Sequence, residues 1–169
     1  HSSPINRIGK SNIEADQEYD IDTLILATGF DAMTGALTSL DIVGRNGIIL
    51  RDQWKQGAKS YLGLGVSNFP NLFTITGPGS PSVLSNMMPS IEQHVNWIAD
   101  CIGWMIDNNK SVIESSLAAE EEWMDLVNEI AGMTIFKSTE SWYNGSNIDT
   151  KAKAFLPFIG VPVYTEKLE

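Results

Sequence analysis

The chain has 169 residues, of which 43% are hydrophobic and 19% charged, a balance typical of a folded globular protein rather than a disordered one. Its formal net charge of −10 argues against binding along a nucleic-acid backbone or at an anionic membrane surface, since both need clustered Lys and Arg. We find no apolar run long enough to span a membrane, no signal-peptide pattern and one cysteine, Cys101. We therefore expect a cytoplasmic protein without disulfides or membrane spans.

Two segments have the composition of buried strands. Residues 3–20 are polar and predict irregular or short-stranded structure, whereas Ile21–Ala27 is an apolar, β-branched run typical of a parallel sheet. Asn71–Thr76 is a second such run, ended by the breakers Gly77-Pro78-Gly79. Between them, Asn46-Gly47 separates two apolar pairs and predicts a hairpin, because both central residues of a type I′ turn need positive φ.

Two helices follow. The first is predicted to begin near Ser90, which can cap it, with Gln93 at the capping-box position. The second runs from about Leu117 to Ile130, and Glu120 to Glu122 on it are expected to form a solvated face. After Thr134 the aromatic content predicts a long loop region packed on the protein. The expected fold is α/β, or α+β, with strands that include Ile21–Ala27 and Leu72–Thr76 packed on the two helices.

The local motifs do not fix the chemistry by themselves. Neither Gly63-Leu64-Gly65 nor Gly77-Pro78-Gly79 matches a dinucleotide fingerprint. The second does join a predicted strand to a helix N-terminus, which fits either a ligand site or an ordinary connection. His94 is expected to be a structural residue rather than a catalyst, Cys101 a buried unreactive thiol, and no His, Cys and carboxylate cluster has metal-ligand spacing.

Three longer segments resemble one enzyme family. Residues 25–31, Ile-Leu-Ala-Thr-Gly-Phe-Asp, look like the ATG motif that joins the NADP and FAD domains of class B flavin monooxygenases. Residues 69–88, followed by 90–95, resemble the part of Baeyer–Villiger monooxygenases that runs past the flavin ring. Residues 141–148 with Lys151 resemble the C-terminal loop of the phenylacetone, cyclohexanone and steroid monooxygenase branch. The resemblance extends from about Tyr19 to Tyr164.

This resemblance implies roles for individual residues. The backbone of Met87 would contact the pyrimidine end of the flavin, and Trp142 would belong to a mobile loop that closes over NADP. Core packing remains the alternative for Leu84 and Met87, and loop packing for Trp142. The implied cofactor contacts are Thr28, Gly29, Gly77, Pro78, Asn86, Met87 and Trp142, and the implied substrate-pocket residues are Ser82, Val83, Leu84 and Met87.

The resemblance also implies an incomplete enzyme. Residues 1–169 would form one domain, with 1–30 at the NADP/FAD junction, 31–110 a strand–loop–helix part of the FAD domain, and 111–169 the C-terminal helix and closing loop. The family's two GxGxxG motifs, its fingerprint and its catalytic arginine cannot be placed, since Arg7, Arg45 and Arg51 lie in other contexts. No catalytic residue is therefore assigned.

The expected parent is an FAD- and NADPH-dependent monooxygenase that oxidises a ketone to an ester or lactone. We expect this chain alone to be inactive and to hold no cofactor tightly. The alternatives are a non-catalytic assembly module that forms a homo-oligomer, and one half of a split flavoprotein that associates with a separate N-terminal portion.

Overall fold

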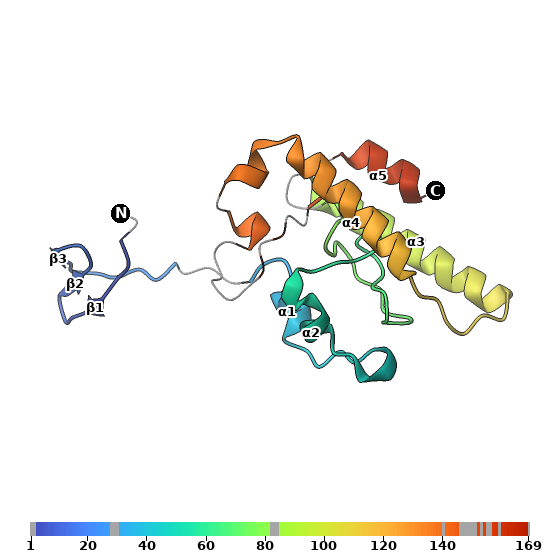
Figure 1. Cartoon of the computed structure of the whole chain (residues 1–169), viewed down its shortest axis with the longest axis horizontal. Coiled ribbons are helices and arrows are strands. Elements are labelled where there is room, and N and C mark those ends of the chain that lie inside the picture. The colour runs from blue at the N-terminus through green and yellow to red at the C-terminus, as the bar shows by residue number, and fades with distance from the viewer. Residues whose placement is uncertain are drawn as a thin grey trace. The chain divides into compact units, whose positions relative to one another are not determined.

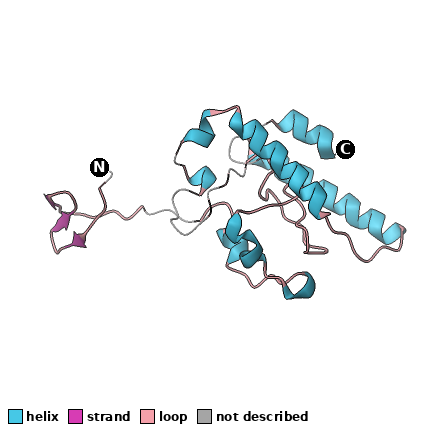
Figure 2. Cartoon of the chain, viewed as in Figure 1, coloured by secondary structure: helices cyan, strands magenta, loops and turns pink. Residues whose placement is uncertain are grey.

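The computed structural model describes residues 3–27, 31–81, 85–139, 141–145, 152, 154, 157–158 and 160–168. The chain divides into two compact units, His1–Phe30 and Asp31–Glu169 (Figure 1). The first contains a small sheet, and the second contains helices joined by irregular segments (Figure 2). The architecture is thus mixed α/β. No helix in the described ranges is both long and apolar enough to cross a membrane.

The first unit contains a three-stranded antiparallel sheet, which is the second of the two expectations, irregular or short-stranded, for residues 3–20. Strands β1 (Arg7–Ile8), β2 (Asn12–Glu14) and β3 (Glu18–Asp20) pair in the order β1-β2-β3. Their register places Ile13 opposite both Ile8 and Tyr19. These cross-strand contacts are the main apolar pairs that the short strands offer each other.

The predicted buried strand at Ile21–Ala27 was wrong. Within the described residues this segment belongs to no strand, and Leu24, Ile25 and Leu26 are 37%, 84% and 69% exposed. A parallel strand is stabilised by strands on either side of it and by helices over both faces. Residues 21–27 have no such neighbours in the described part of the chain, so they do not form a strand despite their β propensity.

The second unit is mainly helical. Its helices are α1 (Gly35–Thr38), α2 (Leu50–Gln53), α3 (Met87–Asp107), α4 (Leu117–Gly132) and α5 (Val161–Leu168). Four short 3₁₀ turns accompany them in the described residues: η1 (Arg45–Gly47), η2 (Trp54–Gln56), η3 (Ile135–Ser138) and η4 (Trp142–Asn144). Helix α5 was not foreseen, because Gly160 and Pro162 made its sequence look like a loop.

The predicted hairpin at Asn46-Gly47 is present in a minimal form. Both residues have positive φ, 55° and 79°, as a type I′ turn requires. The flanking chain closes through the Gly44 N–H, which donates to the Ile48 carbonyl at 2.8 Å, and through one antiparallel bridge, Val43 to Ile49. The strands extend no further because α2 begins at Leu50.

The predicted strand at Asn71–Thr76 was also wrong. Only Phe73 forms a bridge, with Gly65. The residues at both ends of the segment adopt left-handed backbone, with φ of 59° at Asn71 and 52° at Thr76. A strand cannot continue through such residues, so any extended backbone is limited to the residues between them.

The two long helices begin at polar caps. α3 starts at Met87, three residues before the predicted start, because the Asn86 side chain accepts from the Met88 N–H at 3.1 Å. Ser90 is instead buried inside the helix, and Gln93 donates to the Thr165 hydroxyl. α4 has the predicted bounds within two residues, and the Ser116 side chain accepts from the Ala119 N–H.

The core of this unit lies among residues 50–69, which include α2 and η2, and α4 and the C-terminal residues. Trp123 of α4 stacks on Phe158 with ring centroids 4.9 Å apart, and Tyr164 packs on both rings. Phe158 and Tyr164 are 1% and 0% exposed. The prediction that aromatic residues of the C-terminal region pack on the protein is confirmed for these two.

Gly63 lies where two irregular segments approach each other closely, and a substitution there tests that approach. It has a φ of 73°, and a Cβ there would lie 2.4 Å from the Ser80 Cβ and 3.0 Å from the Gly77 carbonyl oxygen. We expect Gly63→Ala to lower the free energy of unfolding by more than about 2 kcal/mol, measured by urea unfolding. The matched control is Gly103→Ala in α3, where a Cβ meets nothing within 4 Å. It should be neutral or stabilising by up to about 1 kcal/mol, and equal losses in both variants would contradict the close approach.

Candidate functional site

The loop at residues 77–80, Gly-Pro-Gly-Ser, turns its backbone into the protein. All four residues are buried, and each of their carbonyl oxygens accepts a hydrogen bond. The Ser80 N–H, within the loop, donates to Gly77. The other three donors come from separate segments: the Ser60 hydroxyl for Pro78, the Trp123 indole for Gly79 at 3.0 Å, and the Phe158 N–H for Ser80 at 2.9 Å. We name this segment the GPGS loop. Its shape is fixed by α4, by residue 60 and by residue 158 together.

The glycines of the GPGS loop are required by packing. Gly79 has a φ of 83°, and a Cβ there would lie 2.9 Å from the Trp123 indole nitrogen. A Cβ on Gly77 would lie 2.5 Å from the Thr74 hydroxyl and 2.7 Å from the Gly63 carbonyl oxygen. Both glycines therefore allow close contact within the protein, which is the reason a side chain is excluded there.

A chain of hydrogen bonds runs through His94, which is fully buried in α3. The Thr76 N–H donates to its Nδ1 at 3.0 Å, so Nδ1 carries no proton. The proton of the neutral ring is then on Nε2, which lies 2.6 Å from the Tyr164 hydroxyl oxygen and donates to it. Tyr164, from α5, donates its own proton to the Leu62 carbonyl at 2.6 Å. His94 is therefore a buried core residue with hydrogen bonds at both ring nitrogens.

Burial sets the protonation state of this chain of hydrogen bonds. Desolvation lowers the pKa of His94 to about 4 and raises the pKa of Tyr164. A second proton on His94 would also place an N–H on Nδ1 against the Thr76 N–H. Both side chains are therefore neutral near pH 7.

The N-terminus of α3 is the polar end of the site. Asn86 is exposed and Met87 half-buried, and the Asn86 side chain is used as the helix cap. Met87 is the first helical residue, so its N–H has no acceptor within the helix. This donor stands at the positive end of a 21-residue helix, where an electron-rich group is favoured.

Trp142 lies in η4, which is capped by Ser141 through a capping box. Its ring is 40% exposed and stacks on Tyr143 with centroids 4.2 Å apart. Tyr143 in turn makes an edge contact with Phe136 of η3. Trp142 is thus presented on an aromatic cluster of three side chains.

Some of the other predicted site residues lie outside the described residues: Thr28, Gly29, Ser82, Val83 and Leu84. Met87 is therefore the one predicted substrate-pocket residue within the described ranges.

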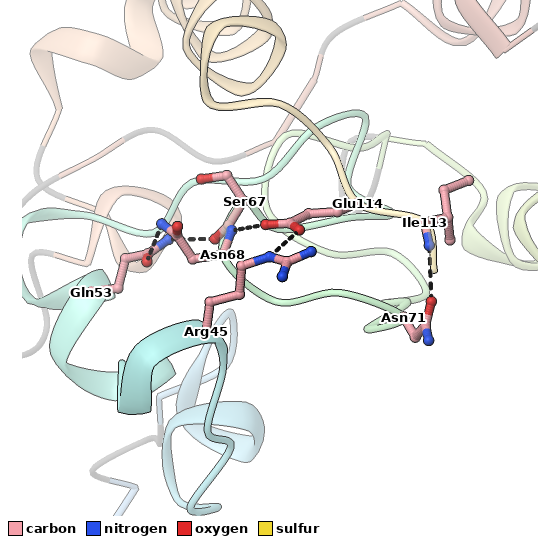
Figure 3. Close-up of polar contacts among 7 residues, drawn as sticks. All are labelled: Arg45, Gln53, Ser67, Asn68, Asn71, Ile113 and Glu114. Atoms are coloured by element: carbon pink, nitrogen blue, oxygen red, sulfur yellow. Dashed lines mark hydrogen bonds and ion pairs between the residues drawn. The ribbon is translucent and has the colours of Figure 1, made fainter. Parts of the chain in front are cut away.

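Glu114 links its own segment to the segments of Arg45 and Asn68 (Figure 3). Its carboxylate accepts from the Asn68 N–H at 2.8 Å and from Arg45 Nε at 2.6 Å. Gln53 donates to the Ser67 carbonyl and accepts from the Asn68 side chain, and the Asn71 side chain accepts from the Ile113 N–H. The guanidinium of Arg45 is therefore engaged in an ion pair, and Arg51 pairs with Asp41.

Glu120 was wrongly predicted to lie on a solvated face. It is 1% exposed, and its carboxylate accepts from both the N–H and the hydroxyl of Ser67, at 2.7 and 3.1 Å. Desolvation raises its pKa, against the lowering effect of the two bonds from Ser67. Its neighbours Glu121 and Glu122 are exposed, as predicted. A run of three glutamates hid this role, because the sequence does not show which one faces Ser67.

Two further features bear on chemistry. Cys101 is half-buried and not buried as predicted, and desolvation raises the pKa of its thiol, in keeping with an unreactive cysteine. An apolar cavity of about 220 Å³ is lined in part by Tyr61, Phe69, Trp97 and Ser115, and the Ser115 hydroxyl has no partner within the described structure. The same described residues include no cluster of three or more His, Cys, Asp or Glu that could hold a metal ion.

Comparison with known proteins gives close relatives although no family model matches the chain. Cyclohexanone 1,2-monooxygenase from Acinetobacter sp is 39% identical over 161 residues, which are 94% of this chain and 29% of the relative. A Baeyer–Villiger monooxygenase from Pseudooceanicola batsensis is 42% identical over 144 residues, 85% of this chain and 26% of that protein.

Solved structures agree. A closed crystal structure of cyclohexanone monooxygenase matches 98% of this chain and 32% of its own, with a TM-score of 0.89 and 37% identity. Oxidized steroid monooxygenase bound to NADP matches 99% of this chain and 32% of its own, with a TM-score of 0.83 and 43% identity.

These relatives are monooxygenases, and solved structures among them contain FAD and NADP. The chain belongs to the Baeyer–Villiger monooxygenase family as a partial, C-terminal part of it, and spans about 29% of the length of the curated relative from Acinetobacter. The family predicted from residues 25–31, 69–88, 90–95 and 141–148 with Lys151 is confirmed.

The buried neutral His94 should make stability depend on pH. Its pKa is about 4 in the folded chain and near 6.5 when unfolded, so the unfolded state takes up the proton first as the pH falls. The stability it contributes is present above pH 6.5 and is lost between pH 6.5 and 4, at up to about 1.4 kcal/mol per pH unit. Urea unfolding at several pH values would measure this, with His94→Asn as the control. An equal slope in the variant would show that other groups are responsible.

Proposed function

We propose that this chain forms one wall of the flavin site of an NADPH-dependent monooxygenase that oxidises ketones to esters or lactones. The observation that carries the proposal is the N–H of Met87, which is half-buried at the start of α3 and has no acceptor within that helix. The relatives support it, since they include cyclohexanone, cyclopentanone and acetone monooxygenases. FAD, when bound and reduced by NADPH, supplies the activation of O₂.

The residues of this chain fit such a role by orienting and polarising the ring. The Met87 N–H would donate to a carbonyl oxygen at the pyrimidine end of the isoalloxazine, and the positive end of α3 would favour negative charge there. The polar backbone atoms of Gly77 and Pro78 are largely used within the protein, so these residues would contribute shape. Trp142, on its aromatic cluster, would close over the nicotinamide side.

The same assignment divides the chain by function. We place residues 1–30 at the junction of the NADP and FAD domains, 31–110 in the FAD domain and 111–169 in the closing region of a flavoprotein with two dinucleotide-binding domains. Phosphate binding would belong to other parts of the enzyme, because the chain has no GxGxxG motif and both Arg45 and Arg51 form ion pairs. The chain alone is therefore expected to be inactive and to bind FAD weakly.

Two measurements test the flavin site. After incubation with FAD and gel filtration, the visible spectrum of the purified chain should show no retained flavin. In an NMR titration at millimolar FAD, the Met87 amide should nevertheless shift. Retained stoichiometric flavin would contradict the weak binding, and an unmoved Met87 amide would contradict the site.

Met87→Pro gives a matched variant for this titration. Proline is tolerated at the first helical position, and Asn86 already has the extended backbone, φ −68° and ψ 115°, that precedes proline. The variant removes the donor. Its affinity for FAD, measured from the shifts of neighbouring residues in the titration, should be about tenfold lower. The control is Met88→Ala, at a 63% exposed position, which keeps the Met87 N–H and should leave the affinity for FAD unchanged.

An assembly role is the second candidate, and the exposed apolar segment of residues 24–26 favours it. Ile25 and Leu26 are 84% and 69% exposed in a segment with strong β propensity. Such a segment tends to add to the sheet edge of another chain, whether a second copy or a separate N-terminal portion. We propose that the isolated chain forms a homo-oligomer through it.

Gel filtration with light scattering tests the assembly role. The chain should elute as an oligomer, and Ile25→Lys should shift it toward monomer because a charge replaces the apolar contact. Thr23→Lys adds the same charge at an exposed polar neighbour and is the control. A sharp monomer peak for the unmodified chain would exclude the proposed oligomer.

A further inference from the structure

Two non-glycine residues of the second unit carry left-handed backbone next to the GPGS loop. Leu62 has a φ of 59° and Thr76 a φ of 52°. This conformation is disfavoured for a leucine and more so for the β-branched Thr76, and it persists only where surrounding structure holds it. Each of the two residues immediately precedes a glycine, Gly63 or Gly77, and the Gly77 N–H donates to the Gly63 carbonyl at 3.1 Å.

The hydrogen bonds of His94 and Tyr164 end on these two residues. His94 accepts the Thr76 N–H, and Tyr164 donates to the Leu62 carbonyl. The two side chains are joined to each other at 2.6 Å, and both are fully buried. One continuous chain of hydrogen bonds therefore clamps both strained positions, and it does so from α3 on one side and α5 on the other.

We infer that His94 and Tyr164 are positioning residues: their hydrogen bonds hold Leu62 and Thr76 in left-handed backbone and so fix where Gly77 and Pro78 lie. If either bond is lost, Thr76 can relax to negative φ, which rotates the peptide that leads into Gly77. The GPGS loop then shifts relative to Gly63. Helix α5 is therefore a structural part of the site, although it is distant from the GPGS loop in sequence. What the loop serves rests on the proposed flavin site; the clamp itself does not.

The first test measures the tautomer in the unmodified chain. Nitrogen-15 NMR of the imidazole should show His94 protonated on Nε2 and unprotonated on Nδ1 between pH 6 and 8, because Thr76 donates to Nδ1. A proton on Nδ1, or a rapid mixture of tautomers, would overturn the inference. This readout needs no variant and therefore does not depend on whether any variant folds.

The second test separates hydrogen bonding from packing through the hydrogen exchange of the Thr76 amide. In His94→Asn the Asn oxygen can take the place of Nδ1, whereas His94→Leu fills the space and removes every acceptor. We expect protection of Thr76 to fall in the order His94, Asn, Leu, with Leu exchanging roughly tenfold faster than the unmodified chain. Packing alone predicts that Leu protects at least as well as Asn, and that order would overturn the inference.

Tyr164→Phe tests the other end of the clamp. Loss of its hydroxyl should shift the amides of Gly63 and Gly77, because the Leu62 carbonyl loses its donor, whereas Tyr61→Phe removes a hydroxyl from the same region and should not shift them. Unmoved Gly63 and Gly77 amides in Tyr164→Phe would contradict the clamp. The FAD titration is read separately: an unmoved Met87 amide sinks the flavin site and leaves the clamp standing.

Discussion

The carbonyl oxygens of the GPGS loop face inward, and each must find a donor because a buried carbonyl without one is costly. Ser80 donates within the loop, and the other donors, Ser60, Trp123 and Phe158, come from segments that are distant in sequence. The second unit is organised around meeting this requirement. Trp123 joins α4 to the loop, and residues 157–158 join the C-terminal region to it. The close contact between Gly63 and Gly77 follows from the same need for the segments to lie near each other.

The parts of the fold that depend on local chemistry could be predicted from the sequence. The Asn46-Gly47 turn needs only two residues that accept positive φ, and α4 needs only its apolar spacing and Ser116. The start of α3 was displaced because Ser90 and Asn86 are both good caps, and sequence alone does not say which one is exposed. Glu120 was misplaced for a similar reason, since its burial is decided by Ser67, far away in the chain.

The two predicted strands failed for different physical reasons. Ile21–Ala27 has the composition of a strand but lacks neighbours in the described structure that would pair with it. Residues 71–76 are bounded by left-handed residues, a feature that Asn71 allows and Thr76 gives no hint of. For the candidate site, the family motifs predicted Gly77, Pro78 and Met87. They did not predict the partnership of His94 with Tyr164, because the two residues meet only through tertiary structure.

The exposure of Leu24, Ile25 and Leu26 has a consequence for the colloidal behaviour of the protein. A short apolar segment of this kind associates with copies of itself unless repulsion keeps molecules apart. The net charge of −10, with Asp20 and Asp22 close to the segment in sequence, opposes this association. Because that charge is carried by carboxylates, acid removes it and salt screens it. Solubility is thus set by a balance between three apolar side chains and the charge of the whole molecule.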